Sequence, residues 1–157
     1  MTEEILTFLR EIGIAVRLEE ITEATFLPGI FIDSGVLKVD LARLKYPGDL
    51  LHEAGHLALL DSAARAATTG DVGDNAGYEM GAIAWSYAAA LHLGIDPQVV
   101  FHADGYRGGA QAILEALTSG GSIGTPMLHW LGLALDERNA REQDLKPYPH
   151  MLRWLRE

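Results

Sequence analysis

The first part of the chain changes from a helical to a strand-like pattern of apolar and polar positions. Residues 2–11 read TEEILTFLRE, with a threonine suited to an N-cap, acidic residues in the first turn and apolar residues at helical spacing. This pattern predicts a helix over residues 2–11 that stops near Gly13. Residues 14–21 alternate and include β-branched side chains, which predicts a strand.

A β-hairpin is predicted next. Two short apolar runs, residues 30–32 and 36–39, flank Asp33-Ser34-Gly35, and glycine can take the positive φ that a tight turn needs. The first strand of this hairpin is short and carries no lysine. It is therefore also a candidate edge for binding an extended peptide by strand addition.

The pattern from residue 47 to the end is mostly helical. Pro47 is expected to open a helix that runs to about residue 66, and a second apolar helix is expected over residues 78–93, before Gly94. Shorter helices are predicted from Asp96-Pro97 and over residues 107–118, 127–135 and 149–157, with polar or glycine-rich breaks at residues 68–77 and 119–126.

This order of elements predicts the fold class. A helix and a small sheet followed by a mostly helical C-terminal half indicate an α+β fold rather than a parallel sheet. The chain shows no internal repeat and no long linker, so residues 1–157 are expected to form a single domain.

Composition narrows the function classes. The 157 residues are 48% hydrophobic, which is enough for a core, and they include no cysteine, which excludes disulfides and thiolate metal sites. The formal net charge of −10 repels phosphate backbones, so nucleic acid is not an expected partner. The N-terminus is acidic, and no window approaches the roughly 18 apolar residues of a membrane span. The chain is therefore expected to be cytoplasmic, with no membrane partner.

The segment LHEAGHLALL, residues 51–60, carries the chemistry. His52 and His56 are four residues apart, so a helix places both imidazoles on one face, where they can bind zinc. Glu53 points away from that direction and can act as a general base on a zinc-bound water. The alternative is a pair of core histidines bonded to the backbone, with Glu53 at a solvated edge. Gly55 inside the helix indicates that something approaches it closely.

A catalytic zinc usually has three protein ligands. The third histidine of metzincins would fall on Ser62, so that class is excluded. Glu79 is the leading candidate, because it begins an apolar helix whose small residues could pack against the motif helix. Asp74, in the preceding loop, is the alternative third ligand. Glu79 can also be explained without a metal, as an exposed glutamate that the helix dipole favours at the start of a helix.

Peptide hydrolysis also needs a group that stabilises the developing oxyanion. His102 and Tyr106 are four residues apart around a glycine-rich turn and could line a cleft. Arg107 could hold a substrate carboxylate. The full set of oxyanion candidates is Tyr78, His102, Tyr106 and His129.

Three segments, GIFIDSGVLKVD, LLHEAGHLALL and YEMGAIAWSYAAAL, together resemble the ImmA/IrrE group of metallopeptidases. The group's later helix has an E-x-x-A-x-x-aromatic pattern, which Glu79, Ala82 and Trp85 match. The resemblance covers residues 29–93 and implies a zincin-like fold, a zinc cofactor and Glu79 as the third ligand. The chain shows no helix-turn-helix pattern, and the family's usual Leu-Met-Pro reads Leu91-His92-Leu93-Gly94 here.

Two functions are consistent with these patterns. The first is a zinc-dependent metallopeptidase that hydrolyses peptide bonds of a protein or peptide substrate, with Glu53 as the base. The second is a non-catalytic regulatory or binding protein that holds a metal on a zincin-like fold. The missing helix-turn-helix pattern and the unmatched C-terminal half motivate this second function.

Overall fold

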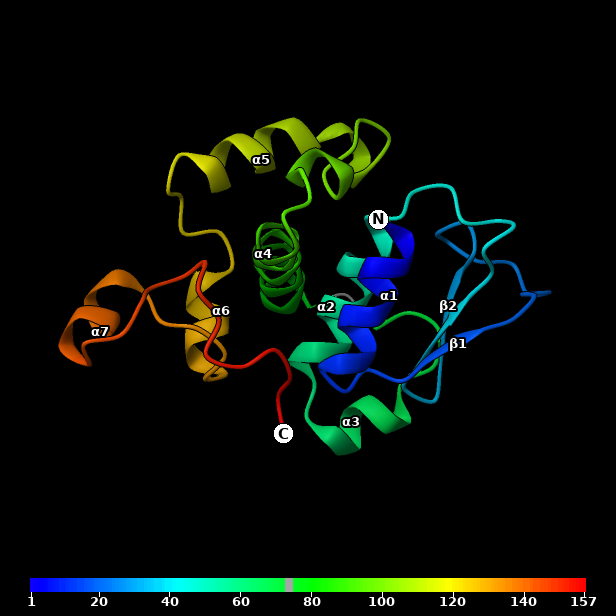
Figure 1. Cartoon of the computed structure of the whole chain (residues 1–157), viewed down its shortest axis with the longest axis horizontal. Coiled ribbons are helices and arrows are strands. Elements are labelled where there is room, and N and C mark those ends of the chain that lie inside the picture. Colours follow the sequence, from blue (N-terminus) through cyan, green and yellow to red (C-terminus); the bar gives the residue numbers. More distant parts are fainter. Residues whose placement is uncertain (73–74) are drawn as a thin grey trace.

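The computed structural model describes residues 1–72 and 75–157 and shows a mixed α+β fold. Figure 1 shows the sheet at one end of the molecule and α7 at the other, with α2 and α4 between them. The helices are α1 (Thr2–Glu11), α2 (Asp49–Leu59), α3 (Ser62–Ala67), α4 (Ala76–Leu93), α5 (Ala110–Thr118), α6 (Thr125–Trp130) and α7 (Glu137–Glu142). The strands are β1 (Val16–Leu18), β2 (Ile30–Asp33) and β3 (Val36–Val39), and the short 3₁₀ turns are η1 (Pro97–Val99) and η2 (Tyr106–Gly108).

Helix α1 has the predicted bounds, and its apolar face is buried. Ile5, Leu6 and Leu9 are fully buried, as the helical spacing of apolar residues requires. The predicted cap is wrong. Met1 occupies the N-cap position without a side-chain hydrogen bond, and Thr2 lies inside the first turn. Glu3 and Glu4 still face the positive end of the helix dipole.

The sheet has the strand order β1-β3-β2, in which β1 is parallel and β2 antiparallel to β3. The predicted hairpin is confirmed. Its two-residue turn, Ser34-Gly35, has φ values of 51° and 76°, the pair of positive angles that matches the twist of a tight hairpin. Strand β1 is shorter than the predicted residues 14–21.

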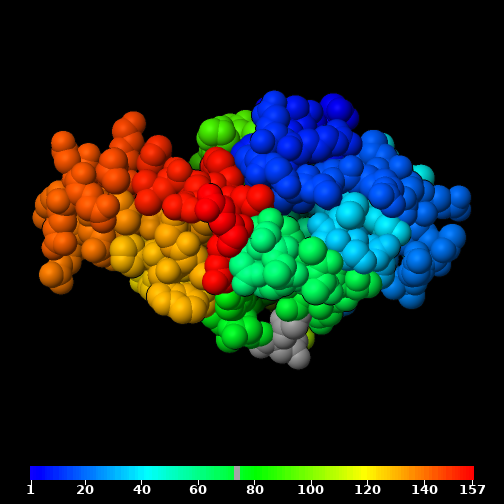
Figure 2. Space-filling view, turned by 90° about the horizontal axis from the view of Figure 1, so that it is seen from below, coloured from blue at the N-terminus to red at the C-terminus, as the bar shows by residue number. Residues whose placement is uncertain are grey.

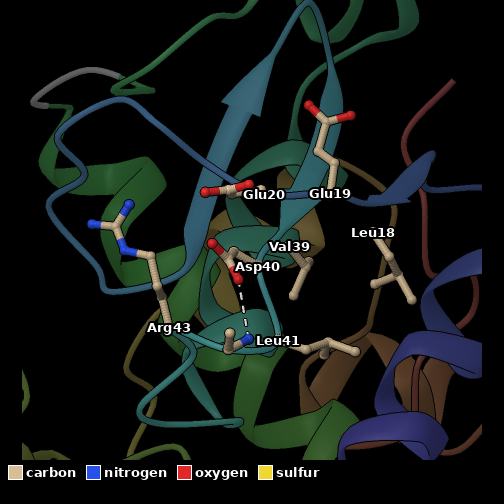
Figure 3. Close-up of a pocket in the computed structure, with 8 residues that line it drawn as sticks. Leu18, Glu19, Glu20, Val39, Asp40, Leu41 and Arg43 are labelled. Atoms are coloured by element: carbon tan, nitrogen blue, oxygen red, sulfur yellow. Dashed lines mark hydrogen bonds between the residues drawn. The ribbon is translucent and has the colours of Figure 1, made fainter.

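After β1, the side chains of Asp40 and Arg43 bind the backbone of the chain. The Asp40 carboxylate accepts hydrogen bonds from the amides of Ile21 (3.2 Å) and Ala42 (3.0 Å), and the Arg43 guanidinium donates to the Ile21 carbonyl. Figure 3 shows Asp40 and Arg43 beside a shallow hollow of about 460 Å³ at this corner of the sheet. The Glu19 amide still donates to the Val39 carbonyl at 3.1 Å, and at Ile21 the side chains of Asp40 and Arg43 take the place of the strand ladder.

The predicted helix over residues 47–66 is two helices. Helix α2 ends at Leu59, and Asp61 takes an extended conformation and caps α3 by accepting from the Ala64 amide at 2.9 Å. At the break, Arg65 donates to the carbonyls of Leu57 (2.9 Å) and Leu60 (2.8 Å), and the Leu57 carbonyl also accepts from the Leu60 amide at 3.3 Å. A local cap and one guanidinium therefore divide the segment.

Helix α4 forms the centre of the molecule. Asn75 caps it by accepting from the amides of Gly77 and Tyr78, and Gly94 ends it with a left-handed φ of 67°. The run of residues 81–90 is buried throughout, so α4 is covered on all sides along that stretch. Even so, none of the helices in the described ranges is long and apolar enough to cross a membrane.

Close packing of α2 on α4 depends on Gly55. A Cβ at this position would lie 3.0 Å from the Ala82 carbonyl oxygen and 3.3 Å from both Ala82 Cα and Trp85 Cε3. The close approach expected at Gly55 is therefore confirmed, and the neighbour is α4. This contact brings the HEAGH turn against the first half of α4.

The C-terminal part departs furthest from the predicted elements. The segment expected to begin a helix at residue 107 first makes the 3₁₀ turn η2, and α5 starts at Ala110. Helix α6 ends at Trp130 instead of residue 135, and Ala134 forms an isolated bridge with Met151. Helix α7, capped by Asp136, was not predicted.

The predicted helix over residues 149–157 is wrong. This tail is irregular, and its backbone groups bond to other elements: the Arg156 amide donates to the Ala58 carbonyl at 2.9 Å, and the Trp154 carbonyl accepts from Trp85 Nε1 at 2.9 Å. Figure 2 shows the tail lying on the surface against the N-terminal segment. Its hydrogen bonds to α2 and α4 take the place of helical ones.

Candidate metal centre

Helix α2 directs two imidazoles at one point. The Nε2 atoms of His52 and His56 are 3.1 Å apart, and their rings meet nearly at right angles with centroids 4.7 Å apart. This follows from their spacing of four residues, which stacks side chains one turn apart on the same face. Both side chains are largely buried, with 14% and 11% of their surface exposed.

Helix α4 brings a carboxylate to the same point. Glu79 Oε1 lies 3.5 Å from His52 Nε2, and Glu79 Oε2 lies 3.1 Å from His56 Nε2. The Glu79 side chain remains 40% exposed, so it forms the solvent-facing side of the cluster. The structure thus brings together the three predicted ligands, whereas the alternative ligand Asp74 lies outside the described residues.

The spacing of these atoms fits a small divalent ion. Two ligands of a tetrahedral zinc with bonds of about 2.0–2.1 Å are separated by roughly 3.3 Å, and the distances within this cluster are 3.1–3.5 Å. Ligand atoms of His52, Glu53 and His56 also lie within 4.8 Å of one another. Glu79 is the better candidate for a third ligand, because its oxygens face both nitrogens, whereas Glu53 is rotated about 100° from His52 around the helix.

The pKa values of the two histidines are shifted in opposite directions. Burial and, less strongly, the neighbouring His56 lower the pKa of His52 to about 4, so His52 is neutral at pH 7. Burial also opposes the charge of His56, but the hydrogen bond to Glu79 and the charge of Glu53 outweigh it and raise the pKa of His56. The His56 hydrogen bond in turn lowers the pKa of Glu79. A charged imidazole must lose the proton on its metal-binding nitrogen before it can bind a metal ion. Protons therefore compete with the metal ion for His56.

Glu53 is placed to exchange a proton near neutral pH. Burial raises the pKa of this carboxyl to about 7, with added repulsion from Asp49, Glu79 and Asp71 and an opposing attraction from His56. A general base works best when its pKa is close to the working pH. The partly buried carboxyl beside the histidine pair therefore has the proton affinity of a general base.

The oxyanion candidates fall in different places. The Tyr106 hydroxyl lies 3.1 Å from His52 Nδ1, on the side of the ring away from Nε2. His102 Nε2 is 2.9 Å from Asp49 Oδ1, and its ring stacks on Tyr46 with centroids 3.8 Å apart. The hydroxyl of Tyr78 accepts from Arg156 Nη1 at 3.2 Å.

Among the described residues, no hydrogen bond or ion pair joins His129 or Arg107 to the cluster. His129 lies on α6, makes no hydrogen bond to His52, His56 or Glu79, and has a buried Nδ1 without a partner in the part of the chain that the structure describes. Arg107 lies in η2 with a φ of 53°. The oxyanion and substrate roles of these side chains stay predictions.

The edge of β2 is partly covered. The Gly70 amide donates to the Ile32 carbonyl at 2.8 Å, and Thr69 Oγ1 accepts from the Ser34 amide at 2.9 Å. A peptide could not pair with β2 at these positions without displacing residues 69–70. Peptide binding by strand addition at β2 has no support from this edge.

The sequence gives Asp49 only a structural role, as an acidic residue in the first turn of the motif helix. In the structure Asp49 precedes Glu53 by one turn on α2, is buried and contacts His102. Helical spacing from Glu53 was the signal that could have linked Asp49 to the site.

Comparison with protein-family models, with curated proteins and with solved structures finds no match to this chain. The resemblance to the ImmA/IrrE metallopeptidases stays a prediction that rests on the three sequence segments. The chemistry of the centre therefore rests on its own geometry.

Proposed function

We propose that this chain is a zinc-dependent peptidase with a zincin-like arrangement, in which His52, His56 and Glu79 hold the metal. The observation that carries the proposal is the convergence of two imidazole nitrogens from α2 and a carboxylate from α4 within 3.1–3.5 Å, beside the partly buried Glu53. Zinc at such a site supplies Lewis acidity toward a carbonyl oxygen and lowers the pKa of water in its open position.

The chain's own residues divide the remaining work. Glu53, with its pKa raised to about 7 by burial, is partly ionised at neutral pH and can accept a proton from the attacking water. The same carboxyl can then donate that proton to the nitrogen of the leaving amine. His52 and His56 stay fixed by α2, while the half-exposed Glu79 marks the side from which a peptide could approach.

Metal content and turnover test this proposal together. Glu53→Gln should keep stoichiometric zinc by elemental analysis and lose chelator-sensitive cleavage of a mixed peptide library. Glu23→Gln, at an exposed position away from the cluster, is the matched control and should behave as wild type. Unchanged cleavage by Glu53→Gln would rule out Glu53 as the base.

A metal-binding regulatory protein without hydrolytic activity is the second candidate. The low exposure of the two histidine side chains, 14% and 11%, favours it, because a peptide carbonyl must reach the metal to be polarised. This function predicts stoichiometric zinc with no cleavage in either wild type or Glu53→Gln. Reproducible cleavage that requires Glu53 would exclude it.

A further inference from the structure

Tyr106 contacts the metal-ligand candidate His52 from behind. Its hydroxyl lies 3.1 Å from His52 Nδ1, and the two rings meet edge to face with centroids 5.3 Å apart and an interplanar angle of 81°. The opposite nitrogen, Nε2, faces His56 and Glu79. What Tyr106 does to Nδ1 therefore decides what Nε2 can offer to a metal.

A phenol hydroxyl can donate or accept, so the distance alone does not give the direction of this hydrogen bond. The proposed metal site gives the direction. A neutral histidine that binds a metal through Nε2 uses the lone pair of that nitrogen, so its proton is on Nδ1 and the Tyr106 oxygen accepts the hydrogen bond.

The same hydrogen bond favours one tautomer of His52. By accepting, the Tyr106 oxygen stabilises the imidazole that carries its proton on Nδ1. A neutral imidazole carries one proton, so a proton on Nδ1 leaves a lone pair on Nε2. That is the tautomer needed to bind a metal through Nε2, and ligating histidines usually have the other ring N–H held in this way.

The backbone at Tyr106 is strained. Tyr106 and Arg107 have consecutive φ values of 54° and 53°, a left-handed conformation that side-chain-bearing residues rarely adopt, and Gly105, Gly108 and Gly109 flank them. Such outliers persist when the surrounding structure requires them, and they gather at functional sites. The strained turn supports the view that the position of the Tyr106 hydroxyl matters.

We propose that Tyr106 is a positioning residue of the metal centre, which holds His52 in the Nδ1–H tautomer with its Nε2 lone pair directed at the metal. This inference rests on the proposed function, because it assumes that His52 binds metal through Nε2. It replaces the oxyanion role predicted for Tyr106 with a role behind the ligand.

The zinc affinity of the metal-free protein tests the positioning role of Tyr106 without any substrate. Competition with a chromophoric chelator should show that Tyr106→Phe binds zinc about 10–100-fold more weakly than wild type. Tyr148→Phe is the matched control, since it also removes one half-buried hydroxyl, which donates to the Ala84 carbonyl of α4 at 2.9 Å. The control should bind zinc with wild-type affinity even if it unfolds at a lower temperature.

The protonation site of His52 separates the hydrogen bond from simple packing. In metal-free wild type, histidine ring nitrogen shifts measured by NMR should show His52 protonated at Nδ1. Tyr106→Phe keeps the ring but removes the accepting oxygen, so it should shift that proton toward Nε2. Tyr148→Phe should leave the His52 shifts unchanged.

Three results would overturn the inference. Zinc affinity of Tyr106→Phe equal to that of wild type would show that Tyr106 has no positioning role, while the metal centre stays intact. His52 protonated at Nε2 in metal-free wild type would show that Tyr106 does not select the tautomer. A wild-type chain that binds no zinc would overturn the metal centre and the role of Tyr106 together.

Discussion

His52 lies on α2, and His102 contacts Asp49, the first residue of α2. Each has one ring nitrogen in a hydrogen bond, but their other nitrogens face different surroundings. His52 meets Tyr106 at Nδ1, and its Nε2 faces a second imidazole and a carboxylate. His102 meets Asp49 at Nε2, and its Nδ1 is buried without a hydrogen-bond partner among the described residues.

The comparison separates a candidate ligand from a structural histidine. Residue type, burial and a single polar partner are common to both positions. The difference is the number of donor atoms that converge on the second nitrogen, which is what a metal ion requires. His102, stacked on Tyr46 and bonded to Asp49, has the surroundings of a residue that holds the start of α2 in place.

The largest expected effect is loss of the metal itself. His56→Ala removes one of the two convergent nitrogens, so zinc measured by elemental analysis after gel filtration should fall from one ion per chain to near zero. The control His150→Ala, at an exposed position in the tail, should keep its zinc. If His56→Ala keeps one zinc ion per chain, His56 is not a metal ligand and the contrast between His52 and His102 loses its basis.

Glu53→Gln should stabilise the metal-free protein, more at pH 8 than at pH 5. The folded-state pKa of Glu53 is raised by burial from 4.5 to about 7, so the wild-type fold loses stability as pH rises through this range, when a buried charge must form. The uncharged variant avoids this loss, which amounts to about 3 kcal/mol at most.

Urea unfolding of both proteins at the two pH values, with zinc removed by chelator, measures the difference. An equal gain at pH 5 and pH 8 would show that Glu53 is not a buried acid with a raised pKa. Glu23→Gln again serves as the exposed control and should show no pH-dependent gain.

Asp49→Asn should leave zinc binding unchanged and cost about 1–2 kcal/mol of unfolding free energy, because the charge-assisted hydrogen bond to His102 is weakened. Elemental analysis and urea unfolding of the same preparation check both parts. A loss of zinc in this variant would place the His102 pair in the metal centre and remove the distinction between the two histidines.

The smallest expected change in stability comes from Gly55→Ala. The new Cβ would press on the Ala82 carbonyl at 3.0 Å, a packing strain of typically 1–3 kcal/mol, while alanine favours the helix by about 1 kcal/mol. The net loss is therefore about 1 kcal/mol. Zinc affinity should fall as well, since separating α2 from α4 moves Glu79 away from the histidines. Unchanged affinity would show that the Glu79 distance does not depend on this contact.

The elements that follow from short-range rules were predicted well. Asp33-Ser34-Gly35 specifies a hairpin turn through residues two apart, and Gly94 ends α4 at its own position. The break between α2 and α3 was missed although its signal, the capping Asp61, is local, because the apolar pattern continues across it. The helix predicted over residues 149–157 is wrong for another reason. The backbone of this tail forms hydrogen bonds to Ala58 and Trp85 in place of helical ones.

The candidate site divides in the same way. The sequence by itself determined that His52 and His56 share a helix face with Glu53 beside them, because the geometry of one helix turn relates residues four apart. Only the tertiary structure decided that Glu79 reaches both nitrogens and that Tyr106 lies behind His52. Those contacts span more than twenty residues, and they depend on how closely α2 packs on α4 and on how a strained turn directs one side chain, neither of which a local pattern encodes.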